Sequence, residues 1–499
     1  MVNAIPAERE GSHGLAIFAA AAFLLGVGLI AVLERVGAPD GLVQALGPLL
    51  ALFELGVIGV MTRAPTLLDF LAARRSAPTL YGALAFAATA AGIGIVMASA
   101  SAGASPMPWR GVAVGLAIAA LIVAPGVRGA NASALGDVLA TGFPAAPTRV
   151  AFALAIAAMS LLTAIAGFDL AAGALVAAIR CSRGVAEALV MLAVAVSIVP
   201  GGLKGLVWSD AACGGGALLI AALGAAFAVA HAPAPLAPLE AALEAGLVEP
   251  ARGGGFPAFW RDLAAAAAVA GFFASTPPAI AAASIGHARR VGLEGLLFAT
   301  AGLALAGIAL PYFEALPAGP SRTSAGLIAA ATWLPALALA RAGVLGVTRS
   351  AGFDLTTVYS RLGVLASRRI ALNRLGMLAT IALCRSAADA RFPDAGRALF
   401  YALAIGLAFI TPALLLTMIR AGASSAMAAF AAGLLVAATG FAFAAPAPPG
   451  PDLLLEALIV GAASLAAGAA FPFVFPRAER RTRRPIADPF VDIPLDVVD

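Results

Sequence analysis

Residues 263–284 read LAAAAAVAGFFASTPPAIAAAS, an uncharged apolar run that Ser275-Thr276-Pro277-Pro278 interrupts. A run of about 20 apolar residues is long enough to cross the hydrocarbon core of a bilayer as one helix. Two adjacent prolines remove two backbone donors and clash with the preceding turn, so we expect the helix to break near its middle. The stretch therefore predicts an interrupted membrane span.

The composition of the whole chain supports a membrane protein. Hydrophobic residues make up 62% of the 499 residues and charged residues only 11%, whereas a soluble domain has about 25% charged residues. This balance excludes a soluble enzyme, a disordered chain and a disulfide scaffold. The net charge is +5, but the basic residues lie between apolar runs and form no continuous face, so we expect no nucleic-acid partner.

Fourteen apolar runs are long enough to span a membrane. They cover residues 14–34, 41–61, 79–99, 108–126, 150–175, 184–200, 206–230, 261–284, 293–315, 323–345, 371–388, 397–419, 422–443 and 453–475. An even number places both termini on one side, and the arginine-rich tail marks that side as cytoplasmic. The cytoplasmic segments then hold twenty basic residues and the opposite side ten, which is the expected direction.

A second interrupted run lies at residues 82–99, GALAFAATAAGIGIVMAS, where Gly92 follows Thr89. It lies five helices before the first interrupted run, as a five-plus-five inverted repeat requires. Interrupted helices at matching repeat positions surround the substrate sites of secondary transporters. Thr89, Gly92, Ser275 and Thr276 are therefore candidate substrate-binding residues. For either run alone, the alternative is a kink that only serves helix packing.

Three stretches carry a family resemblance. TLLDFLAARR at residues 66–75, with Pro78 following, is similar to DFxxAGR…P, and PGGLKGLVWSD at residues 200–210 is similar to GGLxAVxWTDxxQ. The spacing of residues 336–354 parallels ALSTADxxLL…HD. These motifs mark core helix 1, the junction of core helices 4 and 5, and core helix 8 of the sodium/solute symporter family. The chain most resembles its cation/acetate (monocarboxylate) branch, from about residue 41 to residue 475.

The resemblance implies an all-α polytopic fold with a leucine-transporter-type five-plus-five inverted repeat and extra flanking helices. The expected parts are a cytoplasmic N-terminus (1–13), two leading helices (14–61), a ten-helix transporter core (62–419), two C-terminal helices (420–475) and a disordered cytoplasmic tail (476–499). A short amphipathic helix is expected on the outer face within residues 232–257, and a cytoplasmic segment at residues 350–369. Asp210 would lie at the cytoplasmic membrane surface.

The family's sodium site is the part that this chain does not reproduce. A dehydrated sodium ion needs oxygen ligands, and the resemblance assigns them to backbone carbonyls of core helix 1 and to a hydroxyl pair on core helix 8. The corresponding positions are Ala88 and Ala91 for the carbonyls, and Ala338 and Leu339 for the hydroxyl pair. Since alanine and leucine side chains offer no oxygen, sodium coupling is doubtful.

Arg341, within the span at residues 323–345, is the most informative single residue. An arginine inside a membrane span is costly unless it is paired or hydrated, so it suggests function. Three interpretations stay open: its charge replaces the missing sodium, it binds a substrate carboxylate, or its side chain extends to the cytoplasmic surface. The best acidic partner is Asp169, beside Phe168, and Asp169 is also a candidate proton carrier or a structural partner of a nearby arginine.

The sequence thus predicts a secondary active transporter, and not an enzyme, for a small organic solute such as acetate or another monocarboxylate. The alternative is a degenerate homologue that does not transport and acts as a membrane sensor or partner protein. No cofactor is expected, and the coupling ion is Na⁺ or H⁺. The expected location is the bacterial inner membrane, with the lipid bilayer and the solute as partners. Cys213, like the other two cysteines, is interpreted as a small apolar helix residue.

Overall fold

The computed structural model describes residues 28–66, 78–100, 109–125, 146–231, 256–276, 288–315, 322–351, 366–389, 394–418, 422–443 and 451–475, together with residues 21, 25, 26, 69 and 70. All regular elements within these ranges are helical. The N-terminus, the proposed amphipathic helix within 232–257, most of 350–369 and the tail fall outside the described residues.

Thirteen of the fourteen predicted spans coincide with helices, and the first, 14–34, lies largely outside the described residues. Seven helices in the described part of the chain are long and apolar enough to cross a membrane, and two shorter apolar helices accompany them. The helices are α2 (Asp40–Met61), α4 (Thr79–Ala100), α5 (Trp109–Ile118) with η2 (Ala119–Val123), α8 (Ala146–Ile179), α9 (Arg183–Ile198), α10 (Leu203–His231), α12 (Phe256–Ser275), α14 (Ala288–Ala315), α15 (Arg322–Arg349), α17 (Ala366–Asp389), α18 (Ala395–Ile405) with η5 (Gly406–Ile410) and α19 (Thr411–Met418), α20 (Ala423–Phe443) and α21 (Pro451–Val474).

The structure treats the two spans that were predicted to be interrupted differently: one is a continuous helix, and the other ends before its prolines. α4 is a continuous helix through Thr89 and Gly92, so the expected break in this span is wrong in this structure. A glycine weakens a helix by only about 1 kcal/mol relative to alanine, and a membrane penalises any break that leaves backbone groups unpaired. α12 ends at Ser275, directly before the two prolines, which themselves lie outside the described residues.

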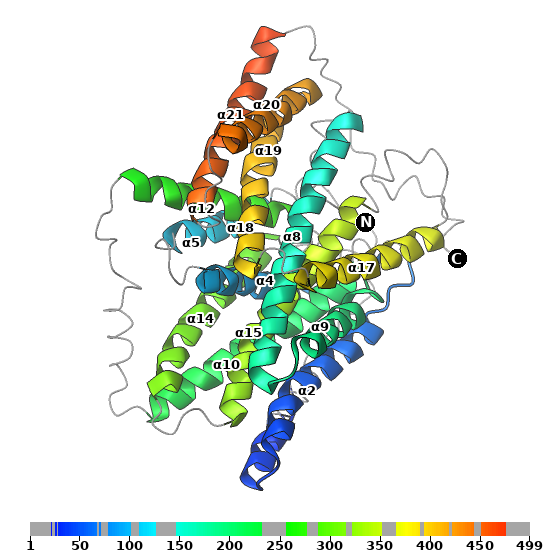
Figure 1. The fold of residues 1–499 in the computed structure, drawn as a ribbon, viewed down its shortest axis with the longest axis vertical. Helices are drawn as coiled ribbons and strands as arrows, with labels where there is room; N and C mark the ends of the chain where they lie inside the picture. The colour runs from blue at the N-terminus through cyan, green and yellow to red at the C-terminus, as the bar shows by residue number, and fades with distance from the viewer. Residues whose placement is uncertain are drawn as a thin grey trace.

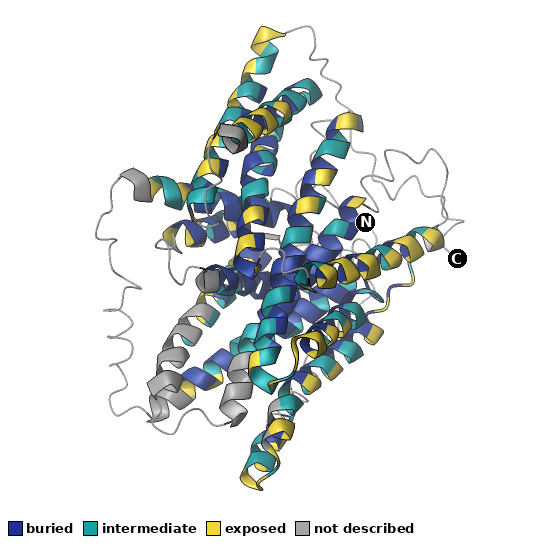
Figure 2. Cartoon of the chain, in the orientation of Figure 1, coloured by how far each residue is buried: buried dark blue, intermediate teal, exposed yellow. Residues whose placement is uncertain are grey.

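The long helix α8 runs through the middle of the molecule, and α15 packs along it (Figure 1). Its 34 residues correspond to about 51 Å of helix. Small residues allow the close approach, because a Cβ atom on Gly167 would clash with the backbone of Ala340, and one on Gly343 would clash with Ala164. Buried residues concentrate around this central contact, whereas α2, α17 and α21 expose their outer faces (Figure 2).

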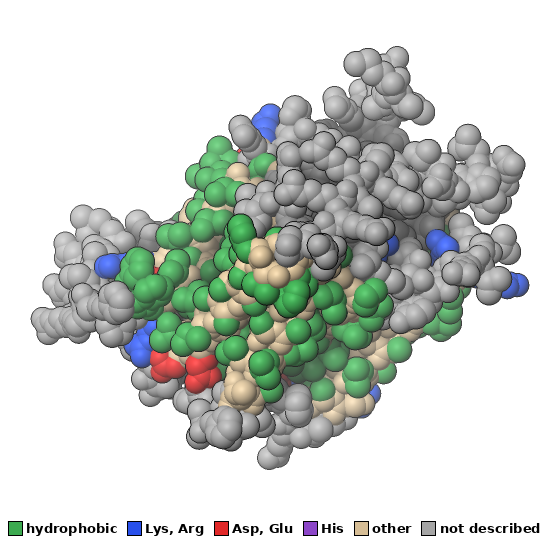
Figure 3. Space-filling model, turned by 90° about the horizontal axis from the view of Figure 1, so that it is seen from above, with side chains coloured by type: hydrophobic (Ala, Val, Ile, Leu, Met, Phe, Trp, Pro, Cys, Tyr) green, Lys and Arg blue, Asp and Glu red, His purple; other side chains and the backbone are tan. Residues whose placement is uncertain are grey.

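Large hydrophobic side chains cover much of the outer surface. Phe53 on α2, Leu435 on α20 and Phe473 on α21 are 70%, 66% and 87% exposed. Viewed from above, hydrophobic side chains occupy most of the described surface and charged ones lie mainly at its edge (Figure 3). An apolar surface of this extent is expected where helices face lipid.

Candidate functional site

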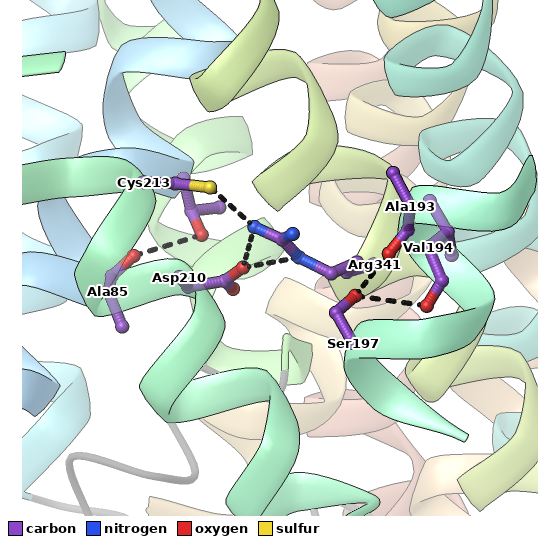
Figure 4. Close-up of polar contacts among 8 residues, drawn as sticks. Ala85, Ala193, Val194, Ser197, Asp210, Cys213 and Arg341 are labelled. Carbon is purple, nitrogen blue, oxygen red and sulfur yellow. Dashed lines mark hydrogen bonds and ion pairs between the residues drawn. The ribbon is translucent and has the colours of Figure 1, made fainter. Parts of the chain in front are cut away.

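The central polar feature is a buried ion pair between Arg341 on α15 and Asp210 on α10. Both side chains are 0% exposed. Arg341 Nε and Nη2 each lie 2.8 Å from the same carboxylate oxygen, Asp210 Oδ1. Arg341 Nη2 also donates to Cys213 Sγ, one turn along α10, at 2.9 Å (Figure 4). These contacts make a charged cluster inside an otherwise apolar helix bundle.

Three closely packed helices surround this cluster. Gly214, next to Cys213, packs against α4, because its Cβ would clash with the carbonyl oxygen of Leu84 and lie 3.4 Å from Ala88 Cβ. Four residues further along α4, a Cβ on Gly92 would lie 2.7 Å from the carbonyl oxygen of Pro335 on α15. The ion pair therefore lies where α4, α10 and α15 meet.

The pair is incompletely satisfied. Among the described residues, Arg341 Nη1 and Asp210 Oδ2 are buried without a hydrogen-bond partner. A buried ion pair gains little net stability unless its remaining donors and acceptors are paired. A charged pair inside membrane-spanning helices therefore marks a candidate functional site.

Two sequence expectations about this cluster are wrong. Asp210 does not lie at a membrane surface, since it is buried inside the bundle. The side chain of Arg341 does not reach the surface either, because it is fully buried and ion-paired. The motif at residues 200–210 looks like a polar turn in sequence, but α10 begins at Leu203 and carries Asp210 two turns inward.

Asp169 is not the partner of Arg341. It pairs instead with Arg183, at the start of α9, and accepts a hydrogen bond from the backbone nitrogen of Ala395 at 3.1 Å. Burial alone would lower the pKa of Arg183, but its bonds to Glu187 and Asp169 raise it. Asp169 thus has the structural pairing that the sequence left open, at a joint between α8, α9 and α18.

The positions that the family resemblance assigns to sodium lie on two helices in contact. Ala338 and Leu339 are fully buried on α15, Ala88 is buried on α4, and Ala91 is half-buried. A Cβ on Gly92 would also lie 3.3 Å from Leu339 Cβ. The two segments therefore face each other with apolar side chains, and their backbone carbonyls are engaged in continuous helices.

The candidate substrate residues are buried on three helices. Thr89 donates to the carbonyl of Ala85 at 3.2 Å, within α4. On α12, Ser275 donates to the carbonyl of Phe272 at 2.8 Å and lies 3.5 Å from Met159 Sδ of α8.

Thr276 donates to the carbonyl of Phe273 at 3.3 Å, and Phe168 is buried on α8. Each of the three hydroxyl groups thus bonds to its own helix. Ser275 also contacts α8, and the Phe273 ring lies 4.7 Å from the Phe86 ring of α4.

Neither partner of Arg341, namely Asp210 or Cys213, was identified from the sequence. Cys213 was interpreted as an apolar helix residue, and its bond to Arg341 joins positions 128 residues apart. Glu54 lies within α2, and its Oε1 is buried without a partner in the described part of the chain. An acidic residue inside an apolar run was visible in the sequence and is a signal for function.

Comparisons with known proteins show the fold. No family model matches the chain, and no curated protein matches it. Among solved structures, the chain is similar to a Na⁺-coupled sialic acid symporter in a substrate-bound outward-open state, a structure described as revealing a novel Na⁺ site. The TM-score is 0.65 at 17% sequence identity, over 87% of this chain and 97% of that one. The predicted all-helical, leucine-transporter-type membrane fold is confirmed.

Proposed function

We propose that this protein is a secondary active transporter that moves a small organic solute across the bacterial inner membrane by alternating access. The shared fold with a Na⁺-coupled symporter supports this class of function. For the solute, we propose a monocarboxylate such as acetate, which is the class that the sequence resemblance implies. Both termini are proposed to be cytoplasmic, as the distribution of basic residues indicates.

The observation that carries the proposal is the buried Arg341–Asp210 pair. It lies beside the two facing segments of α4 and α15 that carry the sodium ligands in the family resembled, where this chain has Ala338 and Leu339. We propose that the fixed charge of Arg341 replaces the bound sodium ion, so transport does not require sodium. A bound cation and a guanidinium both neutralise a buried carboxylate, but only the ion can leave during a transport cycle.

Uptake by purified protein in liposomes tests this function. Labelled acetate, propionate and pyruvate are offered with an inward sodium gradient, an inward proton gradient or neither, and sialic acid is included because of the structural neighbour. We expect uptake of at least one monocarboxylate without sodium and loss of uptake in Arg341→Ser. Sodium-driven uptake would contradict the proposed role of Arg341, and absence of all uptake would favour the non-transporting alternative for these solutes.

A further inference from the structure

Glu54 is an acidic residue inside an apolar helix, and the Arg341–Asp210 pair does not account for it. α2 packs on α8, α9, α10 and α15, and it carries Glu54 in its second half. Glu54 interacts electrostatically with Cys213, the residue that accepts a hydrogen bond from Arg341. Glu54 therefore belongs to the surroundings of the Arg341–Asp210 pair.

Helix geometry places Glu54 at the depth of this cluster. A Cβ on Gly205, near the start of α10, would lie 3.5 Å from Thr62 Oγ1, just after α2, so these two helix ends touch. Glu54 is eight residues before Thr62, and Cys213 is eight residues after Gly205. At 1.5 Å per residue, both side chains lie about 12 Å inward from the shared end.

Charge balance then determines the protonation of Glu54. Arg341 and Asp210 neutralise each other, and both are fully buried. Ionised Glu54 would add a further negative charge inside an apolar helix, where its Oε1 is buried without a partner among the described residues and an unpaired charge is costly. A protonated Glu54 leaves the region neutral and also supplies an O–H donor.

No ion pair of Glu54 with a base on the helices that pack on α2 is seen among the described residues. The remaining ionisable groups on these helices are Arg349 at the end of α15, Lys204 at the start of α10, Arg183 and Glu187 near the start of α9, and Arg149 and Asp169 on α8. Arg183 is held by Asp169 and Glu187. Arg149 and Lys204 lie in the first turns of their helices, and Arg349 lies eight residues beyond Arg341.

We infer that Glu54 is a proton-binding site and that its proton is the ion coupled to transport. The inference rests on the proposed transport function and adds the identity of the coupling ion. In the arrangement seen here, Glu54 is partly buried with its Oε1 enclosed, and it holds the proton. When a rearrangement of α2 against α10 and α15 brings water to Glu54, the carboxyl releases the proton to that side of the membrane.

Infrared difference spectroscopy tests the proton site without any solute. The full-length protein in lipid is titrated with acid and base, and the carbonyl stretch of protonated carboxyl groups is recorded. We expect a titrating band that Glu54→Gln removes and that Glu54→Asp shifts. The matched control Glu456→Gln removes a carboxyl from an exposed position of another membrane helix, α21, and should leave the band in place. A band that persists unchanged in Glu54→Gln would overturn the inference.

Liposome measurements then separate proton coupling from transport itself. We expect Glu54→Gln to lose the stimulation of monocarboxylate uptake by an inward proton gradient, and to keep exchange of labelled for unlabelled solute, which needs no net proton movement. Full stimulation in Glu54→Gln would overturn the coupling role. If the wild-type protein neither takes up nor exchanges any solute, the proposed function fails, while the infrared titration still decides whether Glu54 binds a proton.

Discussion

At the scale of single residues, the buried Arg341–Asp210 pair is the central polar feature. Arg341 could be identified from the sequence because a charge inside an apolar run is visible locally. Its partner could not, since Asp210 is 131 positions away and its motif resembles a surface turn. Pairing across a bundle depends on which helix faces meet, and no local pattern in one sequence specifies this.

Removal of Arg341 alone is expected to destabilise the protein strongly. Arg341→Met leaves Asp210 as an unpaired buried charge, and breaking a buried pair in this way costs about 3–5 kcal/mol. The double variant Arg341→Met/Asp210→Asn removes both charges and should recover most of the loss. Thermal unfolding of the purified variants, followed by tryptophan fluorescence, measures the difference.

The matched control is Arg290→Met on α14. Arg290 is 70% exposed and pairs with Glu294 one turn away, so its loss should cost less than about 0.5 kcal/mol. Equal unfolding temperatures for the single and double variants at the buried pair would contradict the expected role of the unpaired carboxylate.

At the scale of helices, the contact between α8 and α15 depends on residues without side chains. Gly167→Ala should destabilise the protein by about 1–3 kcal/mol, because the new methyl group would clash with the backbone of Ala340 and force the helices apart. Gly173→Ala on the same helix is the control, since its nearest neighbour would be the Arg183 side chain at 3.8 Å.

Alanine also favours a helix over glycine by up to about 1 kcal/mol, so Gly173→Ala should be neutral or stabilising. Thermal unfolding of the two variants side by side gives the comparison. A stable Gly167→Ala protein would mean that α8 and α15 separate at little cost.

A second interhelical contact joins α17 to the ends of two other segments. Arg374 donates to the carbonyl oxygens of Val199 at 3.1 Å, Pro200 at 2.9 Å and Ala64 at 3.3 Å. It also lies 5.8 Å from the centre of the Phe70 ring. One guanidinium thus holds the α9–α10 junction and the segment after α2 against α17.

Arg374→Gln should loosen this end of the molecule. Hydrogen bonds to a charged group contribute about 1.5–3 kcal/mol, so we expect amide exchange to accelerate about tenfold or more in peptides around residues 62–66 and 199–205. Hydrogen–deuterium exchange with mass spectrometry measures it. Arg385→Gln, at an exposed position of the same helix, should leave both peptides unchanged, and protection that is equal in the two variants would contradict the role of Arg374.

At the scale of the whole molecule, membrane spans were more predictable than their internal geometry. Span positions follow from local hydropathy, because a bilayer requires about 20 apolar residues per helix. The helices from α2 to α21 begin and end within five residues of the predicted bounds, except that α12 ends at Ser275 and its predicted span at residue 284. The expected break at Gly92 failed because unbroken backbone hydrogen bonding outweighs the preference of one glycine. Proline removes a donor outright, and α12 does end before Pro277.

The fold and the chemistry of the site also lead to different expectations for sodium. The fold is shared with a Na⁺-coupled symporter, but Ala338 and Leu339 offer no side-chain oxygen and Arg341 already neutralises Asp210. We therefore expect exchange of potassium for sodium at constant ionic strength to leave the unfolding temperature unchanged. A ligand present at 100 times its dissociation constant would add about 2.7 kcal/mol to the free energy of unfolding, which thermal unfolding detects easily.

Choline provides the control for general salt effects. It has the same charge as sodium, but it is a larger ion and does not need oxygen ligands. The variant Ala338→Ser/Leu339→Ser/Arg341→Ser removes the internal cation and supplies hydroxyl groups beside Asp210. If Arg341 replaces sodium, this variant should be less stable than the wild type in choline and should regain stability specifically in sodium. Sodium-specific stabilisation of the wild type would instead mean that the protein binds the ion at other residues, and that the Arg341–Asp210 pair serves the structure and not ion coupling.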